Sequence, residues 1–360
     1  MADTLINTKA ASVTFQNVTK IYGGDIKAVD NISLTIEPGK LVTLLGPSGC
    51  GKTTTLRMIA GLEMPTEGKI FIGDQDVSLL PATDRDVSMV FQSYALFPHM
   101  TVLENVSYGL KYSGFEKEET RTRATAGLEL VGLQGYNDRL PSELSGGQQQ
   151  RVAVARALVL EPQVLLFDEP LSNLDAKLRR QVRQDIRDIQ QNLGLTVVYV
   201  THDQEEALAV SDRIIVMRNA AIAQEGTPRE LYEIPADAFV ADFIGEANLI
   251  PCQIEAVNDG IADITIGTLK HKLDARDLPA GPALVAVRPA RVSLSANIES
   301  SHLAAKITKS TYVGNHMEYE VEAEFGTVFA VSENVETPFI ADQDVGLGFT
   351  RSGPVLLPPK

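Results

Sequence analysis

The sequence predicts an α/β domain built around a parallel sheet, followed by a smaller all-β domain. Three observations predict it. A short apolar run, residues 41–45, leads into a glycine-rich loop and then a helical pattern at 53–60. Apolar runs at 164–167 and 196–200 alternate with helical segments, which is typical of a parallel sheet with helices on both faces. After Gly245 short strands are separated by Gly and Pro turns, which indicates all-β structure.

The chain of 360 residues is long enough for two or three domains by length alone. We expect domains at residues 1–240 and 241–360. Within the first, strand-like alternation over residues 13–36 is broken by a turn at Tyr22-Gly23-Gly24, which predicts an antiparallel β segment. Residues from about 86 to 161 are mostly helical in pattern and predict a helical subdomain at about 90–160.

Composition excludes several classes of protein. The chain has no run of eighteen apolar residues, and residues 1–12 lack the basic and apolar regions of a secretory signal. Cys50 and Cys252 alone offer no disulfide framework, so a reducing cytoplasm is the natural interpretation. A net charge of −15 argues against a broad nucleic-acid surface, and we expect no nucleic-acid partner.

The loop after the first buried run matches the phosphate-binding loop in full. Its residues are Gly46, Pro47, Ser48, Gly49, Cys50, Gly51, Lys52 and Thr53, and Thr54 belongs to the same predicted nucleotide site. The glycines allow backbone N–H groups to converge on phosphate oxygens. Lys52 is expected to contact the β- and γ-phosphates of ATP, and the Thr53 hydroxyl to bind Mg²⁺. The alternative is a glycine-rich turn without a special role, which the Lys-Thr pair after a strand makes a minor one.

A second motif is the apolar run 164–167, which ends in Asp168 and Glu169. A buried strand delivers its last residues to the carboxyl edge of the sheet, where ligands bind in open α/β folds. Asp168 is expected to hold Mg²⁺, and Glu169 to act as the general base on the attacking water. The alternative is an acidic turn at a strand end. Both motifs together predict a nucleotide hydrolase and leave its class open.

A third motif is Ser145-Gly146-Gly147-Gln148, which follows Leu144 and opens a helical run. These residues resemble the signature of the ATP-binding-cassette family. In that family two subunits pack head to tail, and each signature caps the γ-phosphate bound to the other subunit. The alternative is a simple helix cap with Ser145 at its start, which the pattern also fits.

Further landmarks of the family follow in its order. Tyr22 resembles the aromatic that stacks on adenine, with a core or turn tyrosine as the alternative. Gln92 resembles the glutamine that links Mg²⁺ and water to the helical subdomain. Asp175, in the segment 172–175, resembles the loop that communicates across the dimer. His202 resembles the histidine that contacts γ-phosphate and positions water with Glu169; the other four histidines show no metal-ligand spacing.

The resemblance covers essentially the whole chain. Residues 287–289 and 312–314 look like segments of the OB-like regulatory β domain of maltose, polyamine and ferric-iron importer ATPases. The segment Phe91–Val106 is where such ATPases receive a membrane permease, and ordinary subdomain core is the alternative. The resemblance therefore implies an ATP- and Mg²⁺-dependent homodimeric ATPase at the cytoplasmic face of the membrane. It would energise a binding-protein-dependent importer and contact the solute-binding protein only indirectly.

The solute cannot be derived from these residues. Ferric iron is the nearest resemblance, with polyamine, phosphonate and sugar importers close behind. Three other interpretations are weaker. A non-transport member of the family usually has a coiled-coil insertion or two cassettes, and an exporter is usually fused to spanning helices. A phosphate-loop kinase would leave residues 144–148 and His202 unexplained.

Overall fold

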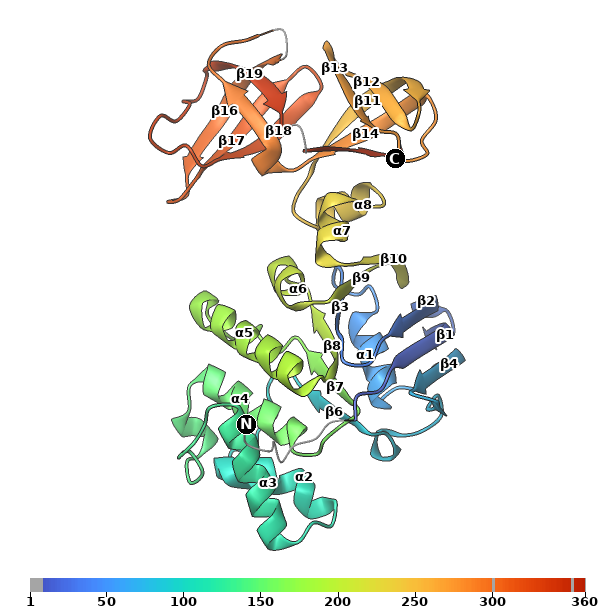
Figure 1. The fold of residues 1–360 in the computed structure, drawn as a ribbon, viewed down its shortest axis with the longest axis vertical. Coiled ribbons are helices and arrows are strands. Elements are labelled where there is room, and N and C mark those ends of the chain that lie inside the picture. Colours follow the sequence, from blue (N-terminus) through green and yellow to red (C-terminus); the bar gives the residue numbers. More distant parts are fainter. Residues whose placement is uncertain (1–8, 300–301, 351–352, 360) are drawn as a thin grey trace. The chain divides into compact units, whose positions relative to one another are not determined.

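The computed structural model describes residues 9–299, 302–350 and 353–359 (Figure 1). Its contacts divide the chain into two compact units, Met1–Pro228 and Arg229–Lys360. The sequence predicts that residues 1–12 are not a secretory signal, and most of this segment, residues 1–8, lies outside the described residues. In the part of the chain that the structure describes, none of the helices combines the length and apolarity needed to cross a bilayer.

The first unit is built on a six-stranded sheet in the order β10-β9-β3-β8-β7-β6. The strands are β3 (Leu41–Leu45), β6 (Val87–Val90), β7 (Val164–Asp168), β8 (Thr196–Thr201), β9 (Arg213–Arg218) and β10 (Ala221–Gly226). Five of them run parallel, and β10 pairs with β9 in the antiparallel direction. Every residue of β3 and β8 is buried, as expected of strands covered on both faces.

The helical prediction for residues 86–161 is wrong at its start, because Val87–Val90 is strand β6. This four-residue run is too short to show a period of its own. It becomes a strand through parallel pairing with β7, in which Val90 stands opposite Phe167. The pairing is a tertiary contact between segments far apart in sequence, and it overrides the local helical pattern.

The antiparallel β segment forms a second sheet, in the order β2-β1-β4-β5. Its strands are β1 (Val13–Tyr22), β2 (Ile26–Ile36), β4 (Glu67–Ile72) and β5 (Gln75–Asp76). The β1–β2 pair confirms the hairpin predicted around Gly23-Gly24. Residues of this sheet share one apolar core with α1 (Lys52–Ala60) and with β3.

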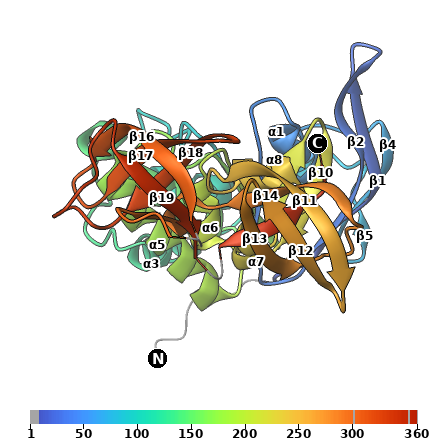
Figure 2. The ribbon, with the colours of Figure 1, turned by 90° about the horizontal axis from the view of Figure 1, so that it is seen from above.

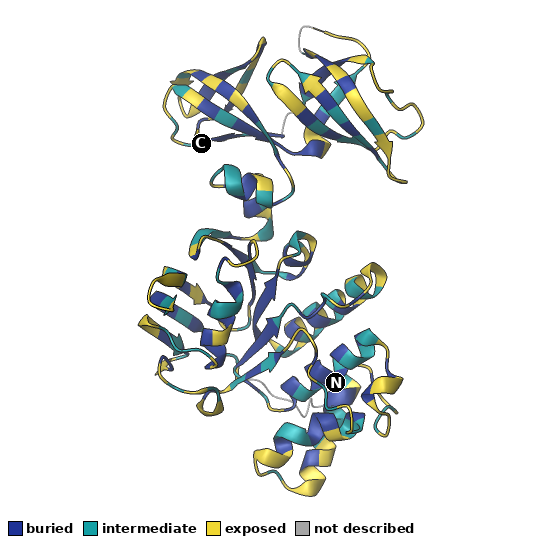
Figure 3. Cartoon of the chain, turned by 180° about the vertical axis from the view of Figure 1, so that it is seen from behind, coloured by how far each residue is buried: buried dark blue, intermediate teal, exposed yellow. Residues whose placement is uncertain are grey.

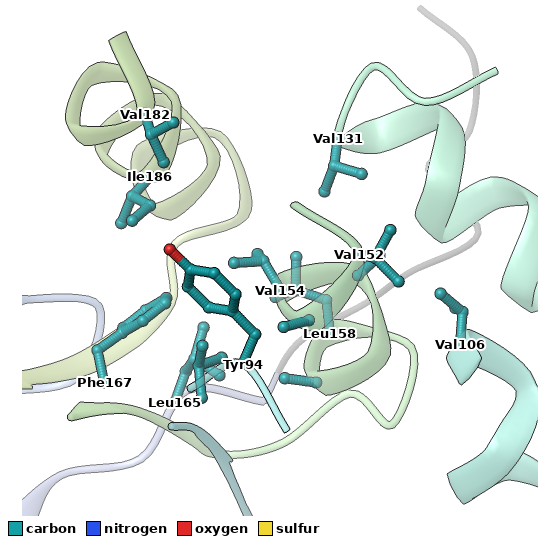
Figure 4. Packing of buried hydrophobic residues seen from close by; sticks show 14 of the residues in the cluster. Tyr94, Val106, Val131, Val152, Val154, Leu158, Leu165, Phe167, Val182 and Ile186 are labelled. Atoms are coloured by element: carbon teal, nitrogen blue, oxygen red, sulfur yellow. The ribbon is translucent and has the colours of Figure 1, made fainter. Parts of the chain in front are cut away.

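The predicted helical subdomain contains α2 (Val102–Tyr112), α3 (Lys117–Leu130) and α4 (Gly146–Leu158). The helices α5 (Ala176–Leu193) and α6 (Gln204–Val210) follow, and short 3₁₀ turns lie at Ala82–Asp84 and Pro141–Glu143. Figure 4 shows Tyr94 inserted between Phe167 of β7 and Leu158 of α4. Tyr94 and Ala95 both have positive φ, 61° and 48°, so the chain reverses sharply here and drives the Tyr94 ring inward. The segment after β6 is thereby anchored in the core.

The second unit begins with α7 (Pro228–Glu233) and α8 (Ala238–Phe243) and continues as two five-stranded sheets. One sheet contains β11 (Asn248–Asn258), β12 (Ile261–Ile266), β13 (Leu269–Asp274), β14 (Gly281–Val287) and β20 (Pro354–Leu357). The other contains β15 (Val292–Ser295), β16 (Leu303–Tyr312), β17 (Met317–Ala323), β18 (Gly326–Ser332) and β19 (Asp344–Phe349), and a 3₁₀ turn at Pro289–Arg291 precedes it. Figure 2 shows β11, β12 and β14 running side by side.

Both sheets of this unit share one apolar core, visible as the buried stripes of Figure 3. The all-β prediction holds from β11 onward, and β17 alternates between buried and more exposed residues as its sequence predicts. The contact division falls earlier than the boundary expected at 240/241, because α8 packs on β11 and β14. Arg288 also donates hydrogen bonds to the carbonyls of Ala241 and Tyr232, which ties both helices to this unit.

Candidate active site

One edge of the six-stranded sheet collects the predicted catalytic residues. The neighbouring parallel strands β3, β8, β7 and β6 end there, followed by residues 46–53, by His202, by Glu169 and by Gln92 respectively. The register brings these ends level: Leu45 stands opposite Thr201, and Asp168 stands opposite Val200. The four segments are dispersed in sequence, so it is the strand order that assembles the site.

The phosphate loop depends on its glycines. A Cβ atom on Gly46 would lie 2.4 Å from the Met217 carbonyl oxygen, and one on Gly51 would lie 2.4 Å from that of Ala28. Gly51 also has a φ of 105°, in the region that favours glycine. Gly51 precedes α1 and provides no side-chain cap, which leaves the first-turn N–H groups of α1 for another acceptor.

The Lys52 ammonium lies inside this loop. Its Nζ donates to the carbonyls of Gly46 and Pro47 at 2.7 and 2.9 Å, and the residue is only 6% exposed. A buried cation held by two neutral carbonyls, beside an uncapped helix start, fits a phosphate group. The Cys50 side chain is buried instead, with Sγ 3.9 Å from Lys52 Nζ, so only the Cys50 backbone is suited to contact a ligand.

Asp168 and Thr53 supply the oxygen atoms that Mg²⁺ prefers. Burial and the nearby Glu169 carboxylate raise the pKa of Asp168. Arg57, a hydrogen bond from the Thr53 side chain, and Lys52 act in the opposite direction on this pKa. The carboxylate and the hydroxyl are therefore adjacent, in a setting where an added cation would favour the ionised carboxylate. The donor set fits Mg²⁺.

Glu169 is held both by its backbone and by its side chain. Its N–H donates to the Val200 carbonyl at 3.0 Å, and its carbonyl accepts from the Ser172 N–H and hydroxyl. Its φ is 45°, a left-handed conformation that costs a non-glycine residue about 1 kcal/mol. The side-chain oxygen Oε2 lies 3.2 Å from Nδ1 of His202. The structure thus brings together the predicted base and the predicted histidine.

Gln92 and Asp175 lie on the two segments flanking this pair. The Asn173 side chain donates to the Gln92 carbonyl at 2.9 Å, so the segment after β6 is tied to the segment after Glu169. Asp175 caps α5 by accepting from the N–H groups of Lys177 and Leu178. The cap accounts for Asp175 structurally, and its predicted role at a dimer interface remains a prediction.

The signature residues open α4 with a capping box. The Ser145 hydroxyl accepts from the Gln148 N–H at 3.4 Å, and the Gln148 side chain accepts from the Ser145 N–H at 2.9 Å. A Cβ atom on Gly147 would lie 2.8 Å from a Leu178 methyl group, and one on Gly146 would lie 3.1 Å from Leu174. The simple helix cap weighed from the sequence is therefore present. It does not exclude the phosphate role, because the helix N-terminus still presents backbone donors.

Tyr22 ends β1 near the start of α1. The residue is 37% exposed, and the Lys20 ammonium lies 4.9 Å from the centre of its ring. Burial and a hydrogen bond to Glu63 raise the pKa of Tyr22, while a hydrogen bond from Thr54 lowers it. An aromatic face thus lies beside the helix that begins at the phosphate loop, as adenine stacking requires.

Two arginines of the site were not identified from the sequence. Arg57, on α1, acts electrostatically on both Asp168 and Tyr22. Arg179, on α5, contacts both Asp203 and the Leu174 carbonyl. Helical periodicity signals which face of a helix is buried, and it carries no information on which loops that face meets.

Comparisons with known proteins agree with this geometry. Residues 29–172 match the ABC transporter family, and residues 285–357 match the TOBE domain. The chain is 61% identical to the Fe(3+) ions import ATP-binding protein FbpC of Rhizobium etli, covering 98% of this chain and 99% of that protein. It is 60% identical to the protein of the same name from Brucella abortus, and this match covers 96% of this chain and 97% of that protein.

Among solved structures, the ATP-binding cassette MJ0796, a dimer in a post-hydrolysis state with ADP and phosphate, is 37% identical with a TM-score of 0.54. The match covers 60% of this chain and 99% of that one. The match to the Rhizobium etli protein covers nearly the whole chain. It therefore includes the phosphate loop, the acidic end of β7, the signature and His202. The chain therefore belongs to the ATP-binding subunits of ABC transporters, and it is an ATPase with a C-terminal TOBE domain.

Proposed function

We propose that this chain is the ATP-hydrolysing subunit of a ferric-iron importer, located at the cytoplasmic face of the membrane. The observation that carries the catalytic part is the convergence of Lys52, Asp168, Glu169 and His202 at one sheet edge. The substrate part rests on the relatives that are about 60% identical over nearly the full length and that bear the name of Fe(3+) import proteins. Importers of polyamine, phosphonate or sugar are the alternatives.

The chain's own residues divide the hydrolytic reaction between them. Lys52 and the N–H groups of the phosphate loop bind the phosphates of ATP and orient the γ-phosphoryl group. Glu169 accepts a proton from the attacking water, and His202 holds Glu169 and the water in place. Asp168 and Thr53, with help from Gln92, would hold Mg²⁺, which would supply charge that offsets the phosphate oxygens. Tyr22 stacks on the adenine ring.

Two copies are needed for a complete site. The side-chain hydrogen bonds described for residues 145–148 join them to one another and to Tyr136, and none reaches the phosphate loop of the same chain. We propose that Ser145, Gly146, Gly147 and Gln148 contact ATP bound to the partner, with Asp175 at the same interface. The dimeric state of the cassette MJ0796 supports this arrangement.

The segment Phe91–Val106 is the proposed docking surface for the permease. Phe91 is 39% exposed, and a groove of about 450 Å³ lies between β6 and α4, lined in part by Phe91, Phe97 and Tyr108. The Phe97 and Tyr108 rings pack 4.5 Å apart. An exposed Phe91 and two half-buried aromatic rings beside a hollow fit an inserted apolar segment of another protein. Other parts of the segment, such as Val102 and Val106, are buried core, so both interpretations of it apply.

The proposal is tested by assembling the chain with its permease and its solute-binding protein. ATP hydrolysis should rise when the binding protein carries ferric iron and stay low when it is empty. Glu169→Gln in the same complex is the control for hydrolysis by contaminants. Stimulation by a polyamine, phosphonate or sugar in place of iron would reassign the substrate, and full activity without any membrane partner would favour a non-transport role.

A further inference from the structure

Arg179 joins the two segments that carry the catalytic pair. It lies in the first turn of α5, after the segment that begins at Glu169. Its Nη2 donates to the Leu174 carbonyl at 3.1 Å, and its Nη1 donates to Asp203 Oδ2 at 3.2 Å. A single planar guanidinium thus holds the end of the Glu169 segment against the residue that follows His202.

The His202 turn is fixed by a buried hydrogen-bond network that Arg179 also touches. Glu206, whose side chain is 4% exposed, accepts hydrogen bonds from the Thr201 hydroxyl at 2.8 Å and from the Tyr199 hydroxyl at 3.3 Å. The Thr201 hydroxyl in turn accepts from the Asp203 N–H at 3.0 Å. Residues 201 and 203, on both sides of His202, are therefore fixed to Glu206.

Arg179 supplies the positive charge for this network. Its Nε lies 3.8 Å from Glu206 Oε1, a distance at which the charges attract without a hydrogen bond. A buried carboxylate needs such a partner, because burial alone disfavours its charge. Asp203 uses its other oxygen, Oδ1, to cap α6 through the Glu206 N–H at 3.1 Å. The two carboxylates that fix the His202 turn, those of Asp203 and Glu206, thus both face one guanidinium.

The His202 side chain itself is 60% exposed and contacts Glu169 at its Nδ1. The backbone turn sets the point from which the exposed imidazole reaches Glu169, so the contact between the two side chains depends on where that turn is held. We propose that Arg179 is a positioning residue for the hydrolytic step, which holds His202 in register with Glu169. Because Arg179 also binds the Leu174 carbonyl, a shift of the segment 172–175 is transmitted to His202.

This inference rests on the proposed catalytic roles of Glu169 and His202. It leads to a specific link between the two halves of the dimer, since segment 172–175 is the part proposed to lie at the interface. When a partner displaces that segment, the Leu174 carbonyl moves with it, and Arg179 carries the displacement to Asp203. The hydrolytic step would then respond to the partner through a contact that touches no nucleotide.

The test compares Arg179→Ala and Arg179→Lys with Arg183→Ala, in the full chain with Mg²⁺ and ATP. Arg183 is the matched control, because it lies one turn further along α5 and donates to the Glu205 carbonyl at 3.2 Å without reaching Leu174 or Asp203. We expect both Arg179 variants to lower kcat about tenfold, with ATP affinity changed by less than about twofold. Arg183→Ala should retain the wild-type kcat.

A double variant separates positioning from a purely structural role. If Arg179 acts through His202, Arg179→Ala should cause no further loss of kcat in a His202→Ala background. The inference would be overturned if the losses of kcat from Arg179→Ala and His202→Ala multiplied in the double variant. It would also be overturned by an equal loss in Arg183→Ala, or by wild-type kcat in both Arg179 variants. His202→Ala at the wild-type rate would overturn the proposed role of His202 as well, so the two failures are distinguishable.

Arg179→Lys keeps the charge and covers the case in which the alanine variant fails to fold. A spectroscopic readout is independent of turnover: the chain has five histidines, so the imidazole NMR signals can be assigned by single substitutions. The His202 signal should shift in Arg179→Lys and stay in place in Arg183→Lys. An unmoved His202 signal in Arg179→Lys would contradict the positioning role.

Discussion

Nδ1 of His202 lies 3.2 Å from Oε2 of Glu169, although the two residues follow the ends of different strands of the sheet. Glu169 is held by the Val200 carbonyl of the neighbouring strand, so the pair is fixed by sheet pairing as well as by its own contact. The contact joins the proposed general base to the proposed positioning histidine. Hydrolysis should depend on it.

Glu169→Gln should abolish turnover while ATP remains bound. Glutamine keeps the size and a polar contact to His202, but it cannot accept the proton of water, so kcat should fall by about 10² to 10⁴-fold. Phosphate release measures the loss, and size-exclusion chromatography with ATP should show a persistent dimer. Glu205→Gln, at an exposed position on α6, is the matched control. Hydrolysis by Glu169→Gln near the wild-type rate would rule out the general-base role.

Asp168→Asn should stabilise the nucleotide-free protein and eliminate Mg²⁺-dependent hydrolysis. Burial and the Glu169 carboxylate raise the pKa of Asp168 in the folded state, so the folded protein binds this proton more tightly than the unfolded chain. The raised pKa therefore lowers the free energy of unfolding once Asp168 is ionised. This loss of stability is absent at pH values below the ordinary aspartate pKa and grows as the pH rises through the raised pKa of the folded state. The variant escapes the penalty at neutral pH.

Thermal unfolding measures this effect. The Tm of Asp168→Asn should exceed that of the wild type by on the order of one to a few degrees at neutral pH. The difference should shrink as the pH falls towards about 4. An equal difference at every pH would show that the substitution acts by some route other than the charge.

Gly147→Ala separates the packing role of the signature glycine from its proposed contact with ATP. A methyl group here would lie 2.8 Å from a Leu178 methyl, so the variant should be less stable by about 1 kcal/mol. Leu178→Ala should cost less stability in the Gly147→Ala chain than in the wild type, because there it also removes the close contact. Chemical denaturation measures both effects. If the glycine also contacts ATP of the partner, hydrolysis should stay low in the double variant, whereas full recovery would reduce Gly147 to a packing residue.

A fragment that starts at residue 229 should be more stable than one that starts at 241. The longer fragment keeps α7 and α8, in which Leu231 and Val240 are fully buried, and it keeps the Tyr232 carbonyl that accepts from Arg288. Without that carbonyl, the buried Arg288 guanidinium loses a partner, which costs about 1–3 kcal/mol. Urea midpoints of the two fragments measure the difference. Equal midpoints would place the domain boundary at 240/241, as the sequence alone predicts.

The parts of the site that were predictable are local in sequence. The phosphate loop, the acidic end of β7 and the signature are each a continuous segment whose chemistry can be identified without knowing what lies beside it. The contact between Glu169 and His202 needs the strand order, which no local pattern contains. The same is true of Val87–Val90, which forms a strand only because β7 lies beside it, and of Arg179, whose partners come from two loops.

Arg156 of α4 donates to the carbonyls of Tyr94 and Ala95 at 2.8 and 2.7 Å. Arg156 lies in the last turn of α4, and Ser145, which caps the start of the helix, lies about 16 Å away at 1.5 Å per residue. The buried Tyr94 ring keeps this loop from moving independently of the core. A displacement of the segment beyond Ala95 is therefore passed to α4 through the Arg156 hydrogen bonds. We expect α4 to tilt as a rigid body, so that a small displacement at Arg156 also moves Ser145 at the other end of the helix.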